Sequence, residues 1–145
     1  MISLPDVNVL VALAWPNHVH HERARSWFEG NHRQGWATAP VTESGFVRVS
    51  SNRRVTPAAT RPEAAILLLR EMTALPGHAF WADDISIARS RWIAAERLLG
   101  HGQVTDAHLV ALALRRRGKL VTFDRGVVEV LPPGAPNDVL LLLRS

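Results

Sequence analysis

The chain has 145 residues, a length typical of one domain built around one hydrophobic core. Hydrophobic residues make up 47% of the sequence and charged residues 21%, which excludes disorder, collagen-like repeats and coiled coil. The absence of cysteine excludes disulfides, zinc–thiolate sites, iron–sulfur clusters and thiol nucleophiles. We therefore predict one soluble globular domain spanning residues 1–145.

The chain also lacks sequence signals for a membrane or for export. No apolar run approaches the roughly 20 residues that a membrane-spanning helix needs. The first basic residue is Arg23, and Pro5 and Asp6 interrupt the start of the chain, which does not fit a secretory signal. We expect a cytoplasmic protein with no membrane partner.

Basic residues outnumber acidic ones by 17 to 13, for a formal net charge of +4. Lys119 is the single lysine among them. Arginine suits bidentate contact with phosphate, so a phosphate-bearing partner fits this composition, although a surplus of this size also occurs for solubility alone.

The first half of the chain alternates between strand and helix patterns. Pro16 breaks the first apolar helix, and Gly30 follows the second, which is amphipathic. The expected elements, in order, are a strand at 2–6, a helix at 7–14, a helix at 20–29, a strand at 36–39 and a helix at 41–49.

The second half continues this alternation. Pro62 opens a helix with an apolar face, and Pro76 stops it. The later elements, in order, are the helix from Pro62 to Met72, a strand at 78–81, a helix at 85–99 ended by Gly100, a helix at 105–117 ended by Gly118, a strand at 120–123, a loop at 130–137 and a strand at 139–143.

This alternation predicts the α/β fold class, with a mostly parallel central sheet of about five short strands and helices on both faces. In such open sheets the ligand site lies beyond the carboxyl ends of the strands. Residues that directly follow a strand, or that stand in the first turn of the next helix, should therefore gather at one edge.

Four acidic residues map to that edge. Asp6 ends the first strand, Glu43 lies in the first turn of a helix, and Asp106 starts a helix behind its expected cap Thr105. Asp124 follows the fourth strand. Four carboxylates in one cleft repel each other, and divalent cations offset this repulsion; without Cys, oxygen ligands favour Mg²⁺ or Mn²⁺. Such a cluster suits metal-assisted phosphodiester hydrolysis.

The charge outside this cluster favours a polyanionic substrate. Without the four acids, 9 acidic residues remain against 17 basic ones, a formal surplus of +8. Arginines would then hold a nucleic-acid backbone. The candidates for this contact are Arg48, Arg53, Arg54, Arg115, Arg116, Arg117 and Arg125.

Each acid also has an ordinary structural interpretation, which is favoured for each residue taken alone. Asp6 suits a helix N-cap, Asp106 complements a helix dipole, and Asp124 suits a turn. Glu43 fits the first turn of a helix or a pair with Arg48. The joint pattern of the four carries the functional prediction.

Other side chains weigh less in the functional prediction. The histidines at 18, 20 and 21 suit a solvated helix start better than a metal site. Most of the five tryptophans should be buried, with one or two left for an interface or for base stacking. Arg115, Arg116 and Arg117 fit a helix dipole as well as a phosphate. Serine hydrolases, P-loop NTPases and Rossmann dehydrogenases are disfavoured because their motifs are missing.

The segments at 4–10, 39–48, 105–109 and 121–126 together resemble the PIN-domain ribonucleases, and among them the VapC toxins of toxin–antitoxin pairs. The resemblance implies a three-layer PIN-like fold and a Mg²⁺-dependent endoribonuclease, with Mn²⁺ as a substitute, that cuts tRNA or rRNA and inhibits translation. It makes Asp6, Glu43, Asp106 and Asp124 the metal-binding quartet and Asn8 a supporting residue. Val7 departs from the Ser or Thr of many relatives.

The resemblance further implies a homodimer and a VapB-like antitoxin that covers the acidic cleft, with an apolar groove between the early helices as its seat. Two alternatives stay open. A metal-dependent phosphatase would require a second Asp at Asn8 and a Lys near the last acid. A non-catalytic module that binds RNA or a protein partner would tolerate the loss of Asp6.

Overall fold

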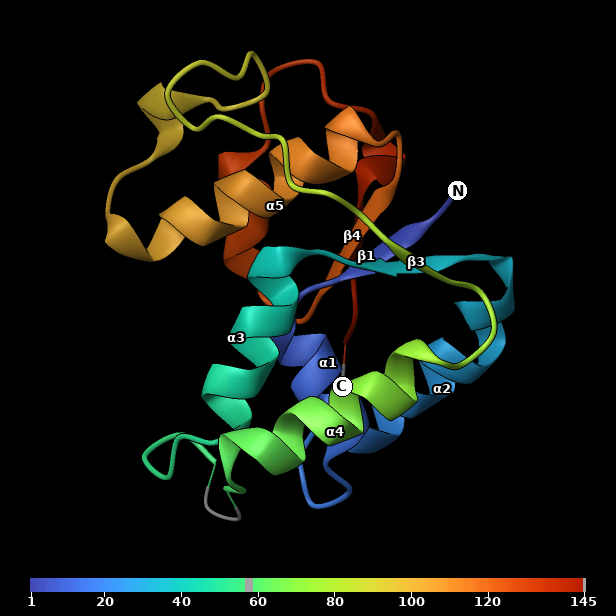
Figure 1. Cartoon of the computed structure of the whole chain (residues 1–145). Helices are drawn as coiled ribbons and strands as arrows, with labels where there is room; N and C mark the ends of the chain where they lie inside the picture. Colours follow the sequence, from blue (N-terminus) through green and yellow to red (C-terminus); the bar gives the residue numbers. More distant parts are fainter. Residues whose placement is uncertain (57–58, 145) are drawn as a thin grey trace.

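The fold is described from a computed structural model, whose described residues are 1–56 and 59–144. Five short parallel strands form one sheet in the order β3-β2-β1-β4-β5 (Figure 1). The α/β prediction with a parallel sheet of five strands is confirmed. The strands are β1 (Ser3–Pro5), β2 (Trp36–Thr38), β3 (His78–Phe80), β4 (Lys119–Thr122) and β5 (Leu140–Leu142).

Helices cover both faces of the sheet, as predicted. Four α-helices lie on one face and α5 lies on the other (Figure 1). The α-helices are α1 (Val7–Ala14), α2 (His21–Asn31), α3 (Pro40–Ser50), α4 (Pro62–Thr73) and α5 (Val104–Arg115). Short 3₁₀ helices occupy His32–Gln34, Ala95–Arg97, His101–Gln103, Arg125–Val130 and Asn137–Val139.

The strands build two cores because successive side chains of a strand point to opposite faces. Trp36 and Val121 pack into the core beneath α1 to α4, whereas their neighbours Ala37 and Leu120 pack into the core beneath α5. Strands buried on both faces are continuously apolar, and this explains the short unbroken apolar runs in the sequence.

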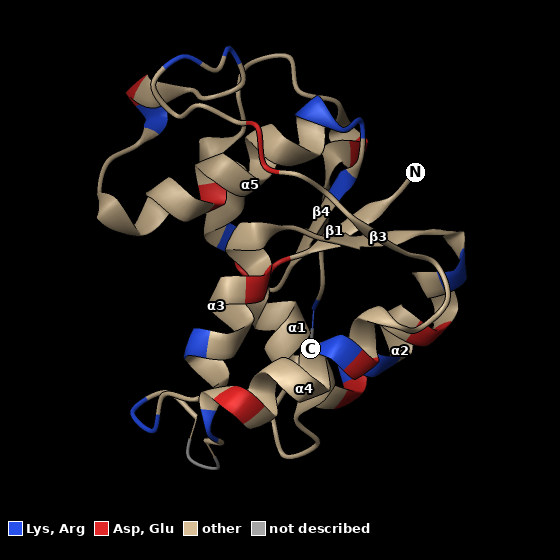
Figure 2. Ribbon diagram, viewed as in Figure 1, with Lys and Arg blue, Asp and Glu red and all other residues tan. Residues whose placement is uncertain are grey.

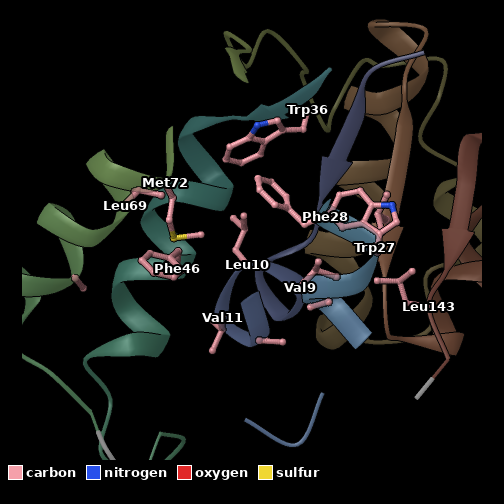
Figure 3. Packing of buried hydrophobic residues seen from close by; sticks show 14 residues of the cluster. Val9, Leu10, Val11, Trp27, Phe28, Trp36, Phe46, Leu69, Met72 and Leu143 are labelled. Carbon is pink, nitrogen blue, oxygen red and sulfur yellow. The ribbon is translucent and has the colours of Figure 1, made fainter. Parts of the chain in front are cut away.

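The first core is rich in aromatic residues (Figure 3). Phe28 of α2 meets Trp36 of β2 edge to face, with ring centroids 5.1 Å apart. Trp27, Trp36 and Trp81 are buried, while Trp15 and Trp92 are half-buried. The prediction that most tryptophans belong to the core is confirmed.

The helix predicted at 85–99 is wrong. This segment crosses α5 as turns, with one short 3₁₀ helix at Ala95–Arg97. The Asp83 carboxylate accepts from the backbone N of Ile85, and the Ser90 hydroxyl accepts from that of Trp92, so side chains compete with helical hydrogen bonds. Ile85, Ile93 and Leu98 of the segment still pack against the second core, whereas Ile87 and Leu99 are exposed.

Helix ends differ from the predictions in smaller ways. Gly30 does not end α2, which continues to Asn31, and the chain reverses at Gly35, where φ is 117°. Gly45 of α3 brings that helix against α1, because a Cβ there would lie 2.5 Å from Val7 Cγ2. Val7 therefore has a packing role, and a larger residue at 45 would push α3 away from Asp6.

Among the described residues, no helix is long and apolar enough to cross a bilayer. The prediction of a single domain over 1–145 includes residues 57, 58 and 145, which lie outside the described residues, and it stays a prediction.

Candidate active site

Asp6 stands where the central strand β1 meets α1. Its backbone N donates to Val121 O of β4 at 2.8 Å, and its Oδ1 accepts from Val7 N at 2.7 Å. The residue is 7% exposed. Asp6 is therefore the N-cap of α1, as its ordinary interpretation predicts, and at the same time a buried carboxylate at the carboxyl edge of the sheet.

Thr122 joins Asp6 to the end of β4. Its buried hydroxyl donates to Asp6 Oδ2 at 2.8 Å, and it accepts from Asp124 N at 3.0 Å and from Asn8 Nδ2 at 3.3 Å. One donated and two accepted hydrogen bonds use the full capacity of a hydroxyl. Sequence reasoning gave Thr122 no role, although a polar residue at the end of an apolar strand, two positions before Asp124, was a usable signal.

Asn8 and Asp124 complete this hydrogen-bonded corner. Asn8 Oδ1 accepts from Phe123 N at 3.4 Å, so Asn8 supports the backbone before Asp124, consistent with its expected role. Asp124 Oδ1 accepts from Gly126 N at 2.8 Å and caps the 3₁₀ helix at Arg125–Val130. The corner thus fixes two carboxylates from opposite ends of the chain.

Asp106 faces the same corner from the first turn of α5. Burial raises its pKa to about 6, and the nearby charges of Asp6 and Asp124 act in the same direction. Burial also raises the pKa of Asp6, against the lowering effect of its hydrogen bonds to Thr122 and Val7. The three aspartates therefore repel each other in a partly desolvated site.

One cavity of about 480 Å³ connects these carboxylates with α1, α3 and the loop after α3. Its polar end holds Asp6, Asn8, Asp106 and Asp124. Its other end is walled by apolar side chains, namely Val7, Val11, Trp15, Val49 and Val55. The predicted convergence of acids at the carboxyl edge of the sheet is correct for Asp6, Asp106 and Asp124.

Glu43 is not part of this cavity, and the prediction that all four acids meet there is wrong for this side chain. Glu43 lies in the first turn of α3, where its Oε2 accepts from Thr38 Oγ1 at 2.6 Å, and it lines a separate pocket between α3 and α4. His78 Nε2 lies 2.8 Å from the same Thr38 oxygen. Because the Thr38 proton goes to Glu43, the histidine must donate.

His78 completes a chain of hydrogen bonds that runs from β3 through β2 to α3. Burial lowers its pKa, while the charge of Glu43 acts in the opposite direction. The buried Thr38 hydroxyl thus fixes the Glu43 side chain away from the three aspartates. Sequence spacing placed Glu43 at the right edge of the sheet but could not give this side-chain direction.

Thr105 does not cap α5 as predicted. The 3₁₀ turn at His101–Gln103 runs directly into the helix, so α5 begins at Val104 and Thr105 is an exposed residue of its first turn. Gln103 takes the N-cap position without a side-chain capping bond.

The oxygen ligands and charge of the three aspartates fit a hard divalent cation. Burial raises the pKa of Asp6 and of Asp106, and neighbouring aspartates act in the same direction, so a cation beside these carboxylates would be favourable. Within the described part of the chain, no three His, Asp or Glu side chains are grouped tightly enough to enclose an ion as they stand. The site thus offers the right ligands and needs side-chain adjustment to close on an ion.

The predicted backbone-binding arginines fall into two groups (Figure 2). Arg53 and Arg54 are exposed in the loop whose next residue, Val55, lines the cavity, and Arg125 is exposed beside Asp124. Arg48 is exposed and lines the pocket that contains Glu43. Contact of these four arginines with a nucleic-acid backbone stays a prediction.

The structure does not bring Arg115, Arg116 and Arg117 to the cavity. They follow the far end of α5, about 14 Å from Asp106 at the helical rise of 1.5 Å per residue. Arg115 donates to Asp84 at 2.9 Å, and Arg116 donates to Ala82 O at 2.7 Å. These contacts support a structural role for Arg115 and Arg116 at the end of the helix.

The histidines after α1 serve local structure. His18 Nδ1 accepts from His20 N at 3.0 Å, and His21 Nδ1 lies 2.8 Å from Ala12 O. His20 stacks on Phe123, with centroids 4.6 Å apart. These contacts give the three histidines local structural roles, and the prediction that they are not a metal site stays a prediction.

The sequence matches the PIN domain family over residues 3–130, the span that contains every member of this site. The chain belongs to the PIN-domain family. Among curated relatives of this PIN domain, ribonuclease VapC39 of Mycobacterium tuberculosis is 50% identical over 139 residues, which cover 90% of this chain and 100% of VapC39. Ribonuclease VapC38 of the same species is 47% identical and covers 98% of this chain and 100% of its own length.

Solved structures show the same fold as this PIN domain. The crystal structure of VapBC2 from Rickettsia felis, bound to a DNA fragment from its promoter, matches with a TM-score of 0.60 at 12% identity, over 99% of this chain and 100% of that one. The sarcin–ricin loop cleaving toxin VapC20 of M. tuberculosis matches with a TM-score of 0.58 at 14% identity, over 90% and 99%. The predicted resemblance to PIN-domain and VapC proteins is confirmed.

Proposed function

We propose that this protein is a VapC-type endoribonuclease that hydrolyses RNA phosphodiester bonds with Mg²⁺, or with Mn²⁺ in its place. The observation that carries the proposal is the convergence of Asp6, Asp106 and Asp124 on one cavity, where Asp106 has a pKa of about 6. Carboxylates with perturbed pKa values in a cleft mark functional sites. The relatives named ribonuclease VapC39 and VapC38 agree in activity class.

A divalent cation held there supplies positive charge that activates water and stabilises the phosphoryl oxygens. The chain's own groups prepare this site. Thr122 and Val7 N orient the two oxygens of Asp6, so that carboxylate is fixed before substrate arrives. A cation beside Asp106 would favour the ionised form of this carboxyl. Asp124 is placed by the hydrogen bond that its Oδ1 accepts from Gly126 N and by the one that its backbone N donates to Thr122.

Glu43 belongs to the proposed ligand set only after its side chain leaves Thr38. Its position one helical turn into α3 is compatible with such a rotation, since the bond from Thr38 is its one side-chain hydrogen bond among those of the described residues. We assign Asp6, Asp106 and Asp124 as the primary ligands and Glu43 as the mobile fourth.

The proposed substrate is tRNA or rRNA in the cytoplasm, and its cleavage would inhibit translation. Arg53, Arg54 and Arg125 are exposed near the cavity and can hold the RNA backbone. Because the relatives are VapC proteins and one structural neighbour is a VapBC complex, we also propose a VapB-like antitoxin as partner and a homodimer as the assembly.

The alternatives differ from this proposal at defined residues. A phosphatase would need an acid at position 8, whereas Asn8 donates to Thr122 and accepts from Phe123 N. A non-catalytic binding module would have no use for three mutually repelling carboxylates.

The test is cleavage of total cellular RNA and pooled tRNA by purified protein free of antitoxin, with Mg²⁺, with Mn²⁺ and with EDTA. Discrete fragments that disappear with EDTA and in Asp6→Asn are expected. Asp138→Asn is the matched control, because Asp138 is exposed and is not among the residues that line the cavity. Protein that binds RNA but cuts none under any ion would replace this proposal with the binding module.

A further inference from the structure

The cavity is larger than the acidic corner requires. From Asp6 it continues between α1, α3 and the loop after α3, where Val11, Trp15 and Val55 form its walls. Its volume of about 480 Å³ lies within the range of sites that enclose one small ligand. A metal ion and a phosphate would leave this apolar end empty.

Trp15 is held in place at that end. Its Nε1 donates to the buried Ser50 Oγ at 3.0 Å, and its backbone N donates to Val11 O at 3.1 Å. The indole is half-buried, so part of the ring remains accessible. A fixed, partly exposed aromatic ring is the feature that proteins use to stack a nucleobase.

Polar groups stand beside this apolar end. Asn17 and His18 line the same cavity. Because His18 Nδ1 accepts from His20 N, its ring proton lies on Nε2, which leaves a hydrogen-bond donor at that atom. Burial and the neighbouring histidines lower the pKa of His18 and favour this neutral form. An amide and an imidazole can hydrogen-bond the edge of a base.

We propose that the Trp15 end of the cavity is a binding subsite for the base of one unpaired nucleotide next to the scissile phosphate. This inference rests on the proposed nuclease function and assigns the Trp15 ring to one base of its RNA substrate. A paired base cannot enter, because neighbouring bases cover its faces and its partner covers its edge. The exposed Arg53 and Arg54, next to Val55, supply positive charge for the phosphates on either side of that base.

The test measures RNA binding apart from cleavage. Fluorescent single-stranded oligoribonucleotides, a duplex of the same length and a matched oligomer lacking its bases are titrated with Asp106→Asn protein in Mg²⁺. We expect the single strand to bind about tenfold more tightly than the duplex or the oligomer without bases. Adding Trp15→Ala should weaken single-strand binding about tenfold and leave the binding of the baseless oligomer unchanged.

Two further variants control for structure. Trp15→Phe keeps a ring for stacking while it loses the bond to Ser50, so it should retain most of the affinity. Trp92→Leu removes the other half-buried tryptophan, which lies under Arg91 at 4.7 Å and away from the cavity, and should bind like the parent protein. Melting curves check the fold of each variant.

Two results would overturn the subsite: equal binding of the intact and the baseless oligomer by the parent protein, or equal losses in Trp15→Ala and Trp92→Leu. The comparison of the intact with the baseless oligomer uses only the parent protein, so it tests the subsite even if Trp15→Ala does not fold. Gels of the wild-type protein with the same oligomers separate the two proposals. Cleavage without base-dependent binding overturns the subsite alone, and base-dependent binding without cleavage overturns the nuclease alone.

Discussion

An aspartate lies at each end of α5, Asp106 within its first turn and Asp84 of the segment after β3 against Arg115, and the two aspartates behave in opposite ways. Near the C-terminal end, Asp84 accepts from Arg115 at 2.9 and 3.2 Å, and this hydrogen bond lowers its pKa. At the N-terminal end, burial and two like charges raise the pKa of Asp106 to about 6. An acid with a basic partner thus has its charge compensated within the fold, whereas grouped acids without one mark the site that binds a ligand.

The largest difference between the two aspartates is expected in the rate of RNA cleavage when each is replaced by asparagine. Asp106→Asn should lower the rate of RNA cleavage by at least about 100-fold, because metal-assisted hydrolysis loses a ligand. Asp84→Asn removes a carboxylate from the same helix neighbourhood and should stay within about twofold of wild type in the same assay, since its partner is structural. Equal losses in the two variants would remove the distinction.

The affinity for a divalent cation tests the grouped aspartates without any cleavage assay. Thr122→Val removes the hydroxyl that orients Asp6 and should weaken Mn²⁺ binding about 10- to 100-fold by titration calorimetry, as losses of residues behind metal ligands do. Thr73→Val is the control, since the Thr73 hydroxyl bonds only to Arg70 O of its own helix. Unchanged Mn²⁺ affinity in Thr122→Val would contradict the role of this hydroxyl.

Stability should respond to pH in the direction set by Asp106. Its folded pKa of about 6 exceeds the ordinary 3.8, so the folded state binds the proton more tightly and loses stability as pH rises from 4 to 6. The shift corresponds to roughly 3 kcal/mol, which solvent screening of this half-exposed group reduces to about 1 kcal/mol. Without divalent ions, Asp106→Asn should raise the free energy of unfolding by about that amount at pH 8.

Urea unfolding at two pH values checks this sign. The gain in Asp106→Asn should shrink as the pH falls through 6 and should vanish only well below 3.8, where wild-type Asp106 is protonated in both states. A loss of stability in this variant at pH 8 would show that Asp106 has a stabilising partner and contradict the comparison.

The smallest expected effect is that of Asp84→Asn on stability. Asp84 and Arg115 are exposed, and exposed ion pairs contribute little. Asp84→Asn should therefore leave the melting temperature unchanged within error at 0.15 M salt. A large drop would mean that the segment after β3 depends on this pair.

The sequence was sufficient for the parts of the fold that local patterns determine. Apolar strands ended by acids, and helices opened by Pro62 or closed near Gly118, gave the element order and hence the edge where Asp6, Asp106 and Asp124 meet. The helix predicted at 85–99 was wrong because the Asp83 and Ser90 side chains accept hydrogen bonds from backbone N–H groups of this segment, and a sequence pattern does not show these bonds.

The site residues that sequence reasoning misplaced depend on tertiary contacts. Glu43 turns toward Thr38, five residues away, because strand β2 presents a buried hydroxyl there. Thr122 gained its role from a partner 116 residues distant, and no pattern within β4 reveals that partner. Arg115 was a candidate for binding a phosphate in the sequence, but in the fold its guanidinium donates to Asp84.

The bond between Thr122 and Asp6 also bears on how the protein is made. It joins positions 116 residues apart, and β1 cannot pair with β4 until residues 119–122 have been synthesised and have left the ribosome. β2 and β3 precede β4 in the chain, so the central strand β1 gains its second neighbour late. A nascent or truncated chain without β4 therefore carries Asp6 without Thr122 and Asp124 on the other side of the cavity.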